Sequence, residues 1–289
     1  MLNSINTYIL YILPHHLLTR IMRVLTRLRL PLLTPAFIKV FARLFHVDMS
    51  EAAEPDMHAY RHFDDFFTRA LHRDARPLAA DATTAICPVD GVISQLGRID
   101  QDRLYQAKGI DYTLGALFGG QQALVDEFKD GQFITLYLSP RDYHRIHMPL
   151  DGTLREMQYV PGRLFSVNPH STQHVAGLFT RNERLIAVFD AECGPLAMIL
   201  VGAMFVSGIE TVWSGMVTQG RSGKTTARWD YSLTEPQIRL ERGEEMGRFH
   251  MGSTVILCLP QDRFEFNPDL LAGTGVQMGQ SLGRLAERP

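Results

Sequence analysis

The sequence predicts an α+β protein with a largely antiparallel β core and an N-terminal layer of amphipathic helices. From about residue 78 onward, short runs of β-branched and aromatic residues alternate with Gly, Pro, Asp and Asn, which is typical of strands joined by turns. Strands and helices do not alternate regularly, so a parallel doubly wound sheet is not expected. Residues before 48 instead show helical periodicity. With 289 residues, 45% of them hydrophobic, the chain is long enough for a substantial core.

Two amphipathic helices are expected near the N-terminus. The first has an apolar line at helical spacing, made by Leu17, Ile21, Val24 and Leu28. A second helix is expected to start at Thr34-Pro35, a cap residue followed by proline in the first turn. Its apolar stripe consists of Phe37, Val40, Phe41 and Leu44. The basic residues on the other faces of the two helices are Arg20, Arg23, Arg27, Lys39 and Arg43.

No acidic residue precedes Asp48, so the charge of this segment is exclusively basic. An apolar stripe beside basic residues predicts helices that lie on an anionic membrane, with the five basic residues as membrane-binding groups. The alternative is that both helices pack on the protein's own core. Polar residues and Pro14 interrupt the charge-free first 19 residues, and a basic n-region with a cleavage site is missing, so neither a spanning helix nor a secretory signal is expected. Residues 1–47 are therefore predicted to form a membrane-associating segment, and residues 48–289 a catalytic β-rich domain.

Within the second segment, a helix is expected from Phe63 to about Leu71, ending before Ala75. The expected strands are Gly91 to Leu96, Phe133 to Leu138, Leu154 to Val160, Leu185 to Asp190, Met198 to Trp213 with a break near Gly208, and Thr254 to Pro260.

Composition excludes several classes of protein. The formal net charge of −2 argues against general nucleic-acid binding. The cysteines Cys87, Cys193 and Cys258 are odd in number and far apart, so buried thiols in a reducing compartment are expected rather than disulfides. His170 and His174 lack a nearby Cys or acidic partner, and no metal site is predicted.

The segment Met251-Gly252-Ser253-Thr254 interrupts what otherwise looks like a plain hairpin, between Gly247–His250 and Val255–Leu259. A Gly–Ser bond held in such a turn can be attacked by its own serine hydroxyl. Gly252 lacks a Cβ, so it is expected to permit a strained turn and close approach of the nucleophile.

Two further polar clusters contain chemistry-bearing residues. Asp90 lies in a Pro-Val-Asp-Gly turn before a strand, and His144 and His147 follow an apolar strand. With Ser253 they supply a nucleophile, a base and an orienting carboxylate. From composition alone, an ordinary Asp-Gly turn and surface, metal-binding or proton-transfer histidines all remain open.

Several blocks of the chain resemble the phosphatidylserine decarboxylase proenzymes, from about residue 60 to 282. The blocks are Phe66-Phe67-Thr68-Arg69, Ala75-Arg76-Pro77, Pro88-Val89-Asp90-Gly91, residues 137–149, residues 162–169, Asn182-Glu183-Arg184, residues 243–247, the Gly-Ser-Thr turn and residues 276–280. One departure is Met251, where the family turn usually has leucine; the two side chains are close in volume, so little changes.

The resemblance implies that Asp90 orients His147, and that His147 deprotonates Ser253 for attack on the Gly252 carbonyl. Cleavage between residues 252 and 253 would give a β chain 1–252 and an α chain 253–289, with Ser253 converted to a covalent pyruvoyl cofactor. Phosphatidylserine would then form a Schiff base with that group and lose CO2, giving phosphatidylethanolamine. His144 is favoured for substrate-carboxylate handling or protonation.

The N-terminal helices and the resemblance together set the expected partners and location. The expected partners are phosphatidylserine, an anionic membrane surface and the α/β heterodimer of the cleavage products, with further dimerisation left open. The expected location is the cytoplasmic face of a bacterial membrane, as a peripheral protein. Two rival functions are a lipid-directed serine hydrolase that uses the same triad without self-cleavage and a membrane-binding scaffold with a degenerate site.

Overall fold

The computed structural model describes residue 11 and residues 13–107, 109–206, 208–218 and 225–286. Its helices are α2 (His15–Thr26), α3 (Leu33–Phe45), α4 (Phe63–Phe67), α5 (Leu114–Leu117), α6 (Gln122–Phe128), α7 (Pro169–His174) and α8 (Leu178–Arg181). Its strands are β1 (Thr84–Ile86), β2 (Gly91–Arg98), β3 (Arg103–Ala107), β4 (Ile110–Thr113), β5 (Gln132–Leu138), β6 (Arg145–His147), β7 (Gly152–Val160), β8 (Arg184–Ala191), β9 (Gly194–Gly202), β10 (Ile209–Thr211), β11 (Gly215–Met216), β12 (Ala227–Asp230), β13 (Arg239–Leu240), β14 (Glu245–Phe249), β15 (Ser253–Leu259), β16 (Phe264–Phe266), β17 (Gly275–Val276) and β18 (Ser281–Leu285).

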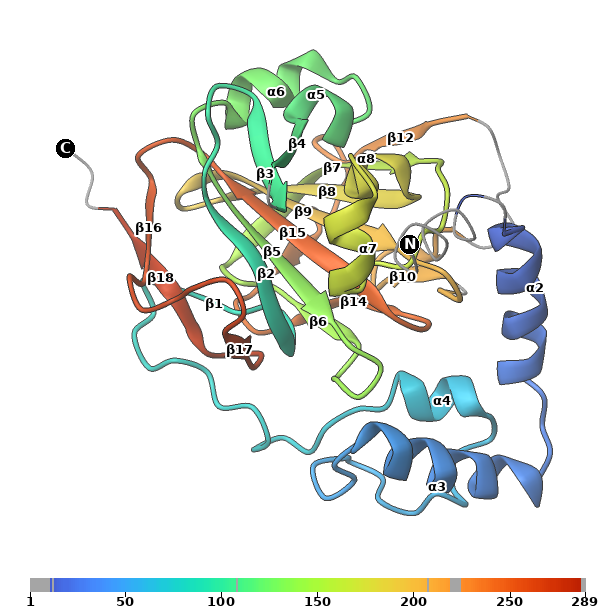
Figure 1. The fold of residues 1–289 in the computed structure, drawn as a ribbon. Coiled ribbons are helices and arrows are strands. Elements are labelled where there is room, and N and C mark those ends of the chain that lie inside the picture. The colour runs from blue at the N-terminus through green and yellow to red at the C-terminus, as the bar shows by residue number, and fades with distance from the viewer. Residues whose placement is uncertain (1–10, 12, 108, 207, 219–224, 287–289) are drawn as a thin grey trace.

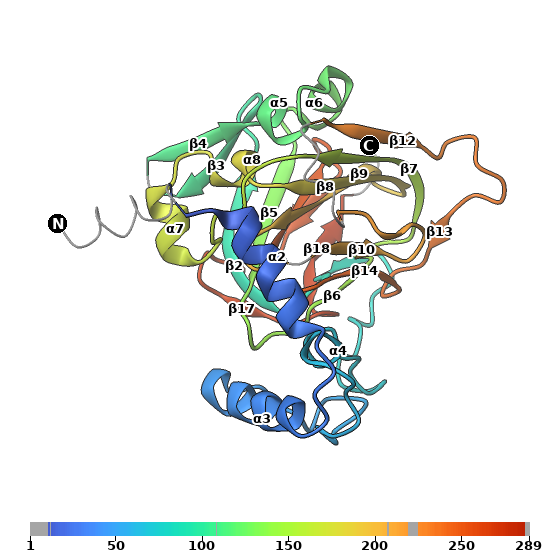
Figure 2. The same ribbon diagram turned by 90° about the vertical axis from the view of Figure 1, so that its right-hand side faces the viewer.

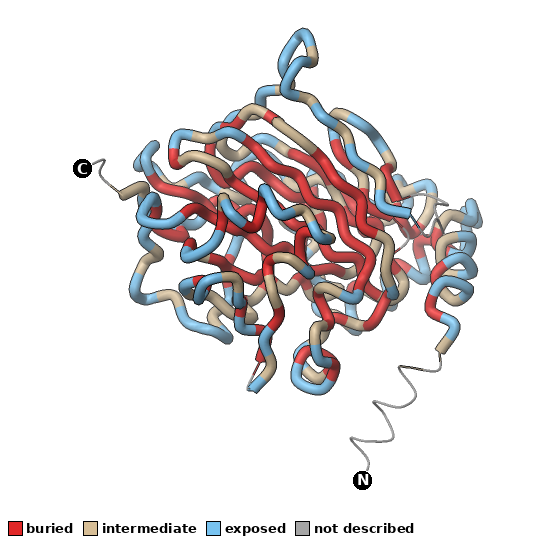
Figure 3. The backbone as a smooth tube through the Cα atoms, turned by 90° about the horizontal axis from the view of Figure 1, so that it is seen from above, coloured by how far each residue is buried: buried red, intermediate tan, exposed pale blue. Residues whose placement is uncertain are grey.

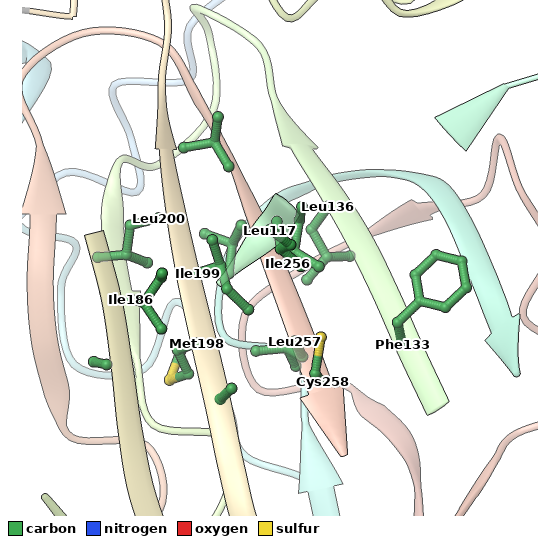
Figure 4. Close-up of a cluster of buried hydrophobic side chains, with 14 of the residues drawn as sticks. Leu117, Phe133, Leu136, Ile186, Met198, Ile199, Leu200, Ile256, Leu257 and Cys258 are labelled. Carbon is green, nitrogen blue, oxygen red and sulfur yellow. The ribbon is translucent and has the colours of Figure 1, made fainter. Parts of the chain in front are cut away.

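The core of the molecule is a nine-stranded antiparallel sheet in the order β12-β7-β8-β9-β15-β5-β2-β17, with β13 also paired to β7. Its central strands are continuous apolar runs, and their side chains interdigitate in one buried cluster (Figure 4). Smaller sheets, β11-β10-β14-β6, β1-β18-β16 and β3-β4, adjoin it. The predicted α+β class with a largely antiparallel core is confirmed.

The predicted hairpin around residues 251–254 is wrong. β14 pairs with β10 and β6 in the four-stranded sheet, whereas β15 pairs with β5 and β9 in the large sheet. All seven residues of β15 are buried, and both of its edges are already hydrogen-bonded, so no edge is left for β14. The segment 250–252 therefore crosses from one sheet to another.

The N-terminal helices lie outside the β core. Figures 1 and 2 show α2 along one side of the molecule and α3 with α4 beneath it. α3 begins at Leu33, so Thr34 lies in the first turn and is not the cap. α4 ends at Phe67, earlier than predicted, and its Phe63, Phe66 and Phe67 form a second buried cluster with α3. Because this cluster joins residues on both sides of residue 47, the predicted boundary there stays a prediction.

The apolar stripe of α2 faces away from the protein, and so do Val40 and Leu44 of the α3 stripe, whereas Phe41 is half-buried against α4. Val24 is 63% exposed and Val40 is 62% exposed, and the outer side of α2 is exposed in Figure 3. The side of α2 that faces the protein carries polar residues, His15, Thr19 and Thr26. Packing on the protein's own core, the alternative for both helices, is therefore not what the structure has for the α2 stripe. The α3 stripe packs on α4 through Phe37 and Phe41, whose rings lie 4.8 and 4.9 Å from that of Phe63. Among the described residues, no helix has the length and hydropathy needed to cross a membrane.

The buried Asn182 side chain joins the segment before β8 to the end of β9. Its Oδ1 accepts from the Phe165 N–H (2.9 Å), and its Nδ2 donates to the carbonyls of Phe165 (2.8 Å) and Gly202 (2.9 Å). Asn182→Ala leaves these three backbone groups unpaired, so we expect the free energy of unfolding to fall by roughly 2–4 kcal/mol, measured by denaturant titration. Asn267→Ala, which removes one exposed hydrogen bond, is the control and should change it by less than about 1 kcal/mol. Equal losses in both variants would contradict this account.

Candidate active site

Ser253 is the first residue of β15, a central strand of the large sheet. It pairs with Leu138 at the end of β5 and with Gly202 at the end of β9. Its side chain is fully buried, and its Oγ has no hydrogen-bond partner among the described residues. A buried hydroxyl without a partner is costly in a purely structural position, and is common at sites of chemistry.

The turn that carries the Gly–Ser bond is strained one residue before the predicted position. Met251 has a φ of 81°, in the left-handed region that side chains with a Cβ rarely adopt. Gly252 is not in that region, and a Cβ added to it would meet nothing within 4 Å. The expectation that Gly252 provides the strained conformation is therefore wrong; Gly252 instead leaves open space beside the carbonyl that the serine would attack.

His147 is the last residue of β6, which pairs with β14 at the edge of the four-stranded sheet. Its Nδ1 lies 2.8 Å from the Gly243 carbonyl, which can only accept, so Nδ1 carries the proton. Nε2 then accepts a hydrogen bond from the Tyr143 hydroxyl at 3.0 Å. Burial lowers the pKa of His147, with the Gly243 hydrogen bond acting in the opposite direction. His147 is thus a neutral imidazole whose basic nitrogen, Nε2, accepts the hydrogen bond from Tyr143.

His144 precedes β6 and is fully buried. Its Nδ1 donates to the Asp142 carbonyl at 2.8 Å, and its Nε2 has no hydrogen-bond partner among the described residues. Phe67 of α4 covers the imidazole, with ring centroids 4.1 Å apart. Burial lowers the pKa of His144 to about 3, so the ring is neutral and its Nε2 lone pair is free.

Asp90 lies in the turn before β2 and is paired with Arg76. Arg76 Nη2 is 2.6 Å and Nε 2.9 Å from the Asp90 carboxylate, and Arg76 also pairs with Glu51 at 2.7 Å. The Met278 N–H donates to Asp90 Oδ1 at 2.8 Å. Arg76 and Asp90 both line a cavity of about 290 Å³.

The structure brings the four predicted residues to one region but does not join them as expected. The His147 N–H donates to the Pro88 carbonyl at 2.9 Å, and the Phe249 N–H to the His144 carbonyl at 3.0 Å, so Asp90, both histidines and the turn lie on adjoining backbone. Among the described residues, however, no hydrogen bond links Asp90 to His147 or His147 to Ser253; Gly243, Tyr143 and Arg76 occupy those positions. The roles assigned to the triad and to His144 stay predictions.

Four residues around the site were not given a role by sequence reasoning: Phe67, Arg76, Tyr143 and His250. Phe67, Arg76 and Tyr143 lie in the blocks that carried the family resemblance, so a signal was present, but their contacts are tertiary. His250 immediately precedes the turn, and its partners come from residues 64 and 210. No local sequence pattern indicates that Asp64 and Glu210 contact His250.

Of the predicted membrane-binding residues, Arg20, Lys39 and Arg43 are exposed and Arg23 is partly buried. Arg27 differs, because its Nε donates to Asp64 Oδ2 at 2.9 Å. It therefore ties the end of α2 to α4.

The surroundings of Gly252 and Ser253 fit the formation of a pyruvoyl group. The Ser253 Oγ is free, Gly252 leaves space at the scissile carbonyl, and His144 and His147 are neutral. In the part of the chain that the structure describes, no cluster of three or more His, Cys, Asp or Glu residues could hold a metal ion.

Comparison with known proteins gives the class. A family model described as phosphatidylserine decarboxylase matches residues 63–284, and a second, described as PSD, matches residues 5–46. The chain is 52% identical over 272 residues to the phosphatidylserine decarboxylase proenzyme of Pseudomonas aeruginosa (strain LESB58), covering 94% of each chain. It is 50% identical over 275 residues to that of Azotobacter vinelandii, covering 95% of this chain and 96% of the relative. The protein is thus an enzyme of the carboxy-lyase class. It belongs to the phosphatidylserine decarboxylase family.

Proposed function

We propose that this protein decarboxylates phosphatidylserine to phosphatidylethanolamine and CO2, using a pyruvoyl group that it makes from Ser253 by cutting its own chain. The observation that supports this most is the buried, unpartnered Ser253 hydroxyl directly after Gly252, in a chain of this family. Neutral histidines on adjoining backbone supply the proton acceptor that such a hydroxyl needs.

In the self-cleavage step, His147 takes the Ser253 hydroxyl proton through Nε2, after the Tyr143 hydroxyl gives up that nitrogen. Ser253 Oγ attacks the Gly252 carbonyl carbon, and the peptide nitrogen leaves it as an amine that takes the proton back from His147, converting the amide to an ester. Loss of the Ser253 α-proton then breaks the Cβ–Oγ bond, releases a Gly252 carboxylate and leaves dehydroalanine. Hydrolysis with one water releases ammonia and gives the pyruvoyl end of the α chain. Asp90 helps through charge, since it favours a proton on His147.

In the decarboxylation step, the pyruvoyl ketone supplies the electron sink that pyridoxal phosphate supplies in other enzymes. His144 is the residue we assign to proton delivery. Burial depresses its pKa to about 3, so a proton placed on Nε2 is readily given away to a nearby carbanion. Phe67 and the Asp142 carbonyl fix the ring orientation.

The membrane surface is the partner that we infer for α2 and α3, at the cytoplasmic face of a bacterial membrane. Their apolar stripes are largely exposed, up to 68% at Leu44, and Arg20, Lys39 and Arg43 are exposed beside them. Each basic residue near an anionic surface contributes about 1 kcal/mol. On this proposal the cleaved enzyme is an α/β heterodimer with residues 1–47 as its membrane-associating part.

Charged substitutions on the apolar stripe test this placement. The double variant Val24→Asp, Val40→Asp should lose at least roughly tenfold in binding to vesicles with anionic headgroups, because two charges would enter the acyl boundary. Binding is measured by vesicle co-sedimentation. Leu233→Asp, at a residue 90% exposed in a different part of the surface, is the control and should bind like wild type. Unchanged binding of the double variant would rule out this face as the membrane contact.

The proposed function is tested by the intact mass of the purified protein. We expect two chains separated between Gly252 and Ser253, with the smaller one blocked at its N-terminus and reactive toward hydrazines. A lipid-directed serine hydrolase predicts a single 32.7 kDa chain with esterase activity, and a scaffold predicts a single chain without activity. A single chain in the wild type would refute self-processing.

A further inference from the structure

His250, two residues before Gly252, lies between two carboxylates. Its Nδ1 is 2.9 Å from Asp64 Oδ2, and its Nε2 is 2.8 Å from Glu210 Oε2. The side chains of His250 and Asp64 are only 8% and 4% exposed. A neutral imidazole has one N–H, so its other nitrogen would direct a lone pair at a carboxylate. The geometry therefore fits the doubly protonated imidazolium.

The surrounding charges agree with an imidazolium. Arg27, after α2, pairs with Asp64 at 2.9 Å, and Arg248 of β14 lies 3.8 Å from Glu210. Arg27 Nη2 is 3.4 Å from His250 Nδ1, but both groups are donors here, so this contact is not a hydrogen bond. Arg23 of α2 acts on Asp64 at longer range. The cluster thus balances two carboxylates with His250 and the arginines around it.

The pKa shifts follow from the same contacts. Burial acts to lower the pKa of His250, but the hydrogen bonds to Asp64 and Glu210 outweigh it, and the pKa is raised above its usual value. Burial acts to raise the pKa of Asp64, whereas His250 and Arg27 lower it overall, and the hydrogen bond from His250 lowers that of Glu210. The three shifts therefore all favour the charged form of the group concerned.

The same segment is anchored on the helical layer by a second contact. Met251, with its left-handed backbone, packs against the cluster formed by α3 and α4. The His250 N–H also donates to the Gly208 carbonyl at 2.9 Å. The scissile turn is thus fixed at its start by an ion cluster and by an apolar contact, both of which involve the helices before the β core.

We propose that charged His250 is a positioning residue for self-cleavage: its ion pairs with Asp64 and Glu210 hold the strained turn so that Ser253 faces the Gly252 carbonyl. Through Asp64 and Arg27, the end of α2 takes part in this positioning. The proposal rests on the proposed self-cleavage. It gives the reaction a second pH dependence besides that of its base.

The sign of that dependence follows from the raised pKa. Stabilisation by charged His250 is complete below the unfolded-state pKa of about 6.5 and is lost as pH rises through the higher folded-state pKa. His147, whose pKa is lowered, becomes protonated only at pH values below about 6.5. The cleavage rate should therefore have an acid limb from His147 and an alkaline limb from His250.

The test follows cleavage of the full chain after a pH jump. Radiolabelled proenzyme from brief cell-free synthesis is diluted into buffers from pH 5.5 to 9.5, and the appearance of the 253–289 fragment is timed on gels. We expect His250→Gln to slow cleavage by roughly tenfold or more at neutral pH and to remove the alkaline limb, because a buried charge pair is broken. His250→Lys, which keeps a cation, should recover most of the rate and cleave at alkaline pH where wild type fails. Exposed His58→Gln should behave as wild type.

Two further measurements separate positioning from folding. Each substitution is also made with Ser253→Ala, and the thermal midpoint of the uncut chain is compared at pH 7. A double-mutant cycle of His250→Gln with Asp64→Asn should be non-additive in cleavage rate. The proposal would be overturned if His250→Gln were cleaved at the wild-type rate with the wild-type alkaline limb of the pH profile. It would also be overturned if both His250 variants were cleaved more slowly but kept that alkaline limb. If wild type itself is never cut at Gly252–Ser253, the proposed function fails instead.

Discussion

Ser253→Ala is expected to yield a single uncut chain of about 32.7 kDa without decarboxylase activity. The reason is that the substitution removes both the nucleophile and the only source of the pyruvoyl carbonyl. Activity should fall by at least roughly 10⁴-fold, because no other group of the chain can replace the electron sink. The β core should stay intact, since the Oγ has no hydrogen bond to any described residue that could be lost. Intact mass, hydrazine labelling and CO2 release from phosphatidylserine measure the three outcomes.

The matched control is Ser281→Ala, an exposed serine in the same C-terminal fragment. It should be cut and labelled like wild type. Decarboxylation by uncut Ser253→Ala protein would contradict the proposal directly. Cleavage of that variant at residue 252 would show that the hydroxyl is not the nucleophile.

The second large effect is a separation of function between the two histidines. His147→Ala should leave the proenzyme uncut or slow its cleavage by about 10²–10⁴-fold, the contribution of a general base. His144→Ala should still cut, yet decarboxylate about 10²–10⁴-fold more slowly, because the proton donor is gone. Asp90→Asn should resemble His147→Ala. Gel analysis of cleavage and CO2 release per hydrazine-reactive chain separate the two stages.

Exposed His174→Ala is the control for both histidines and should leave both stages unchanged. Since His144 supports Phe67, the thermal midpoint of His144→Ala is compared with wild type to exclude a folding defect. If His144→Ala blocks cleavage in a folded protein, the division of labour is reversed. The structure gives a reason to test the assignment, because His144 Nε2 has no hydrogen-bond partner among the described residues, whereas His147 Nε2 is hydrogen-bonded to Tyr143.

Much of the fold could be predicted because it follows from local patterns. β5 and β8 differ from their predicted ranges, Phe133 to Leu138 and Leu185 to Asp190, by at most one residue at each end. Such runs identify themselves by β-branched residues between turns. The β14–β15 hairpin was wrong because pairing depends on which edges other strands already occupy, and β5 and β9 lie far away in sequence.

The sequence by itself determined the residues of the site and the kind of chemistry open to them: a Gly–Ser bond, an aspartate, two histidines and basic amphipathic helices. These properties belong to residue type and local spacing. Only the tertiary structure decided which groups contact each other, since burial forces each polar atom to find a partner wherever the chain brings one. It paired Arg76 with Asp90 and Tyr143 with His147, left the Ser253 hydroxyl without a partner among the residues described, and set His250 between Asp64 and Glu210.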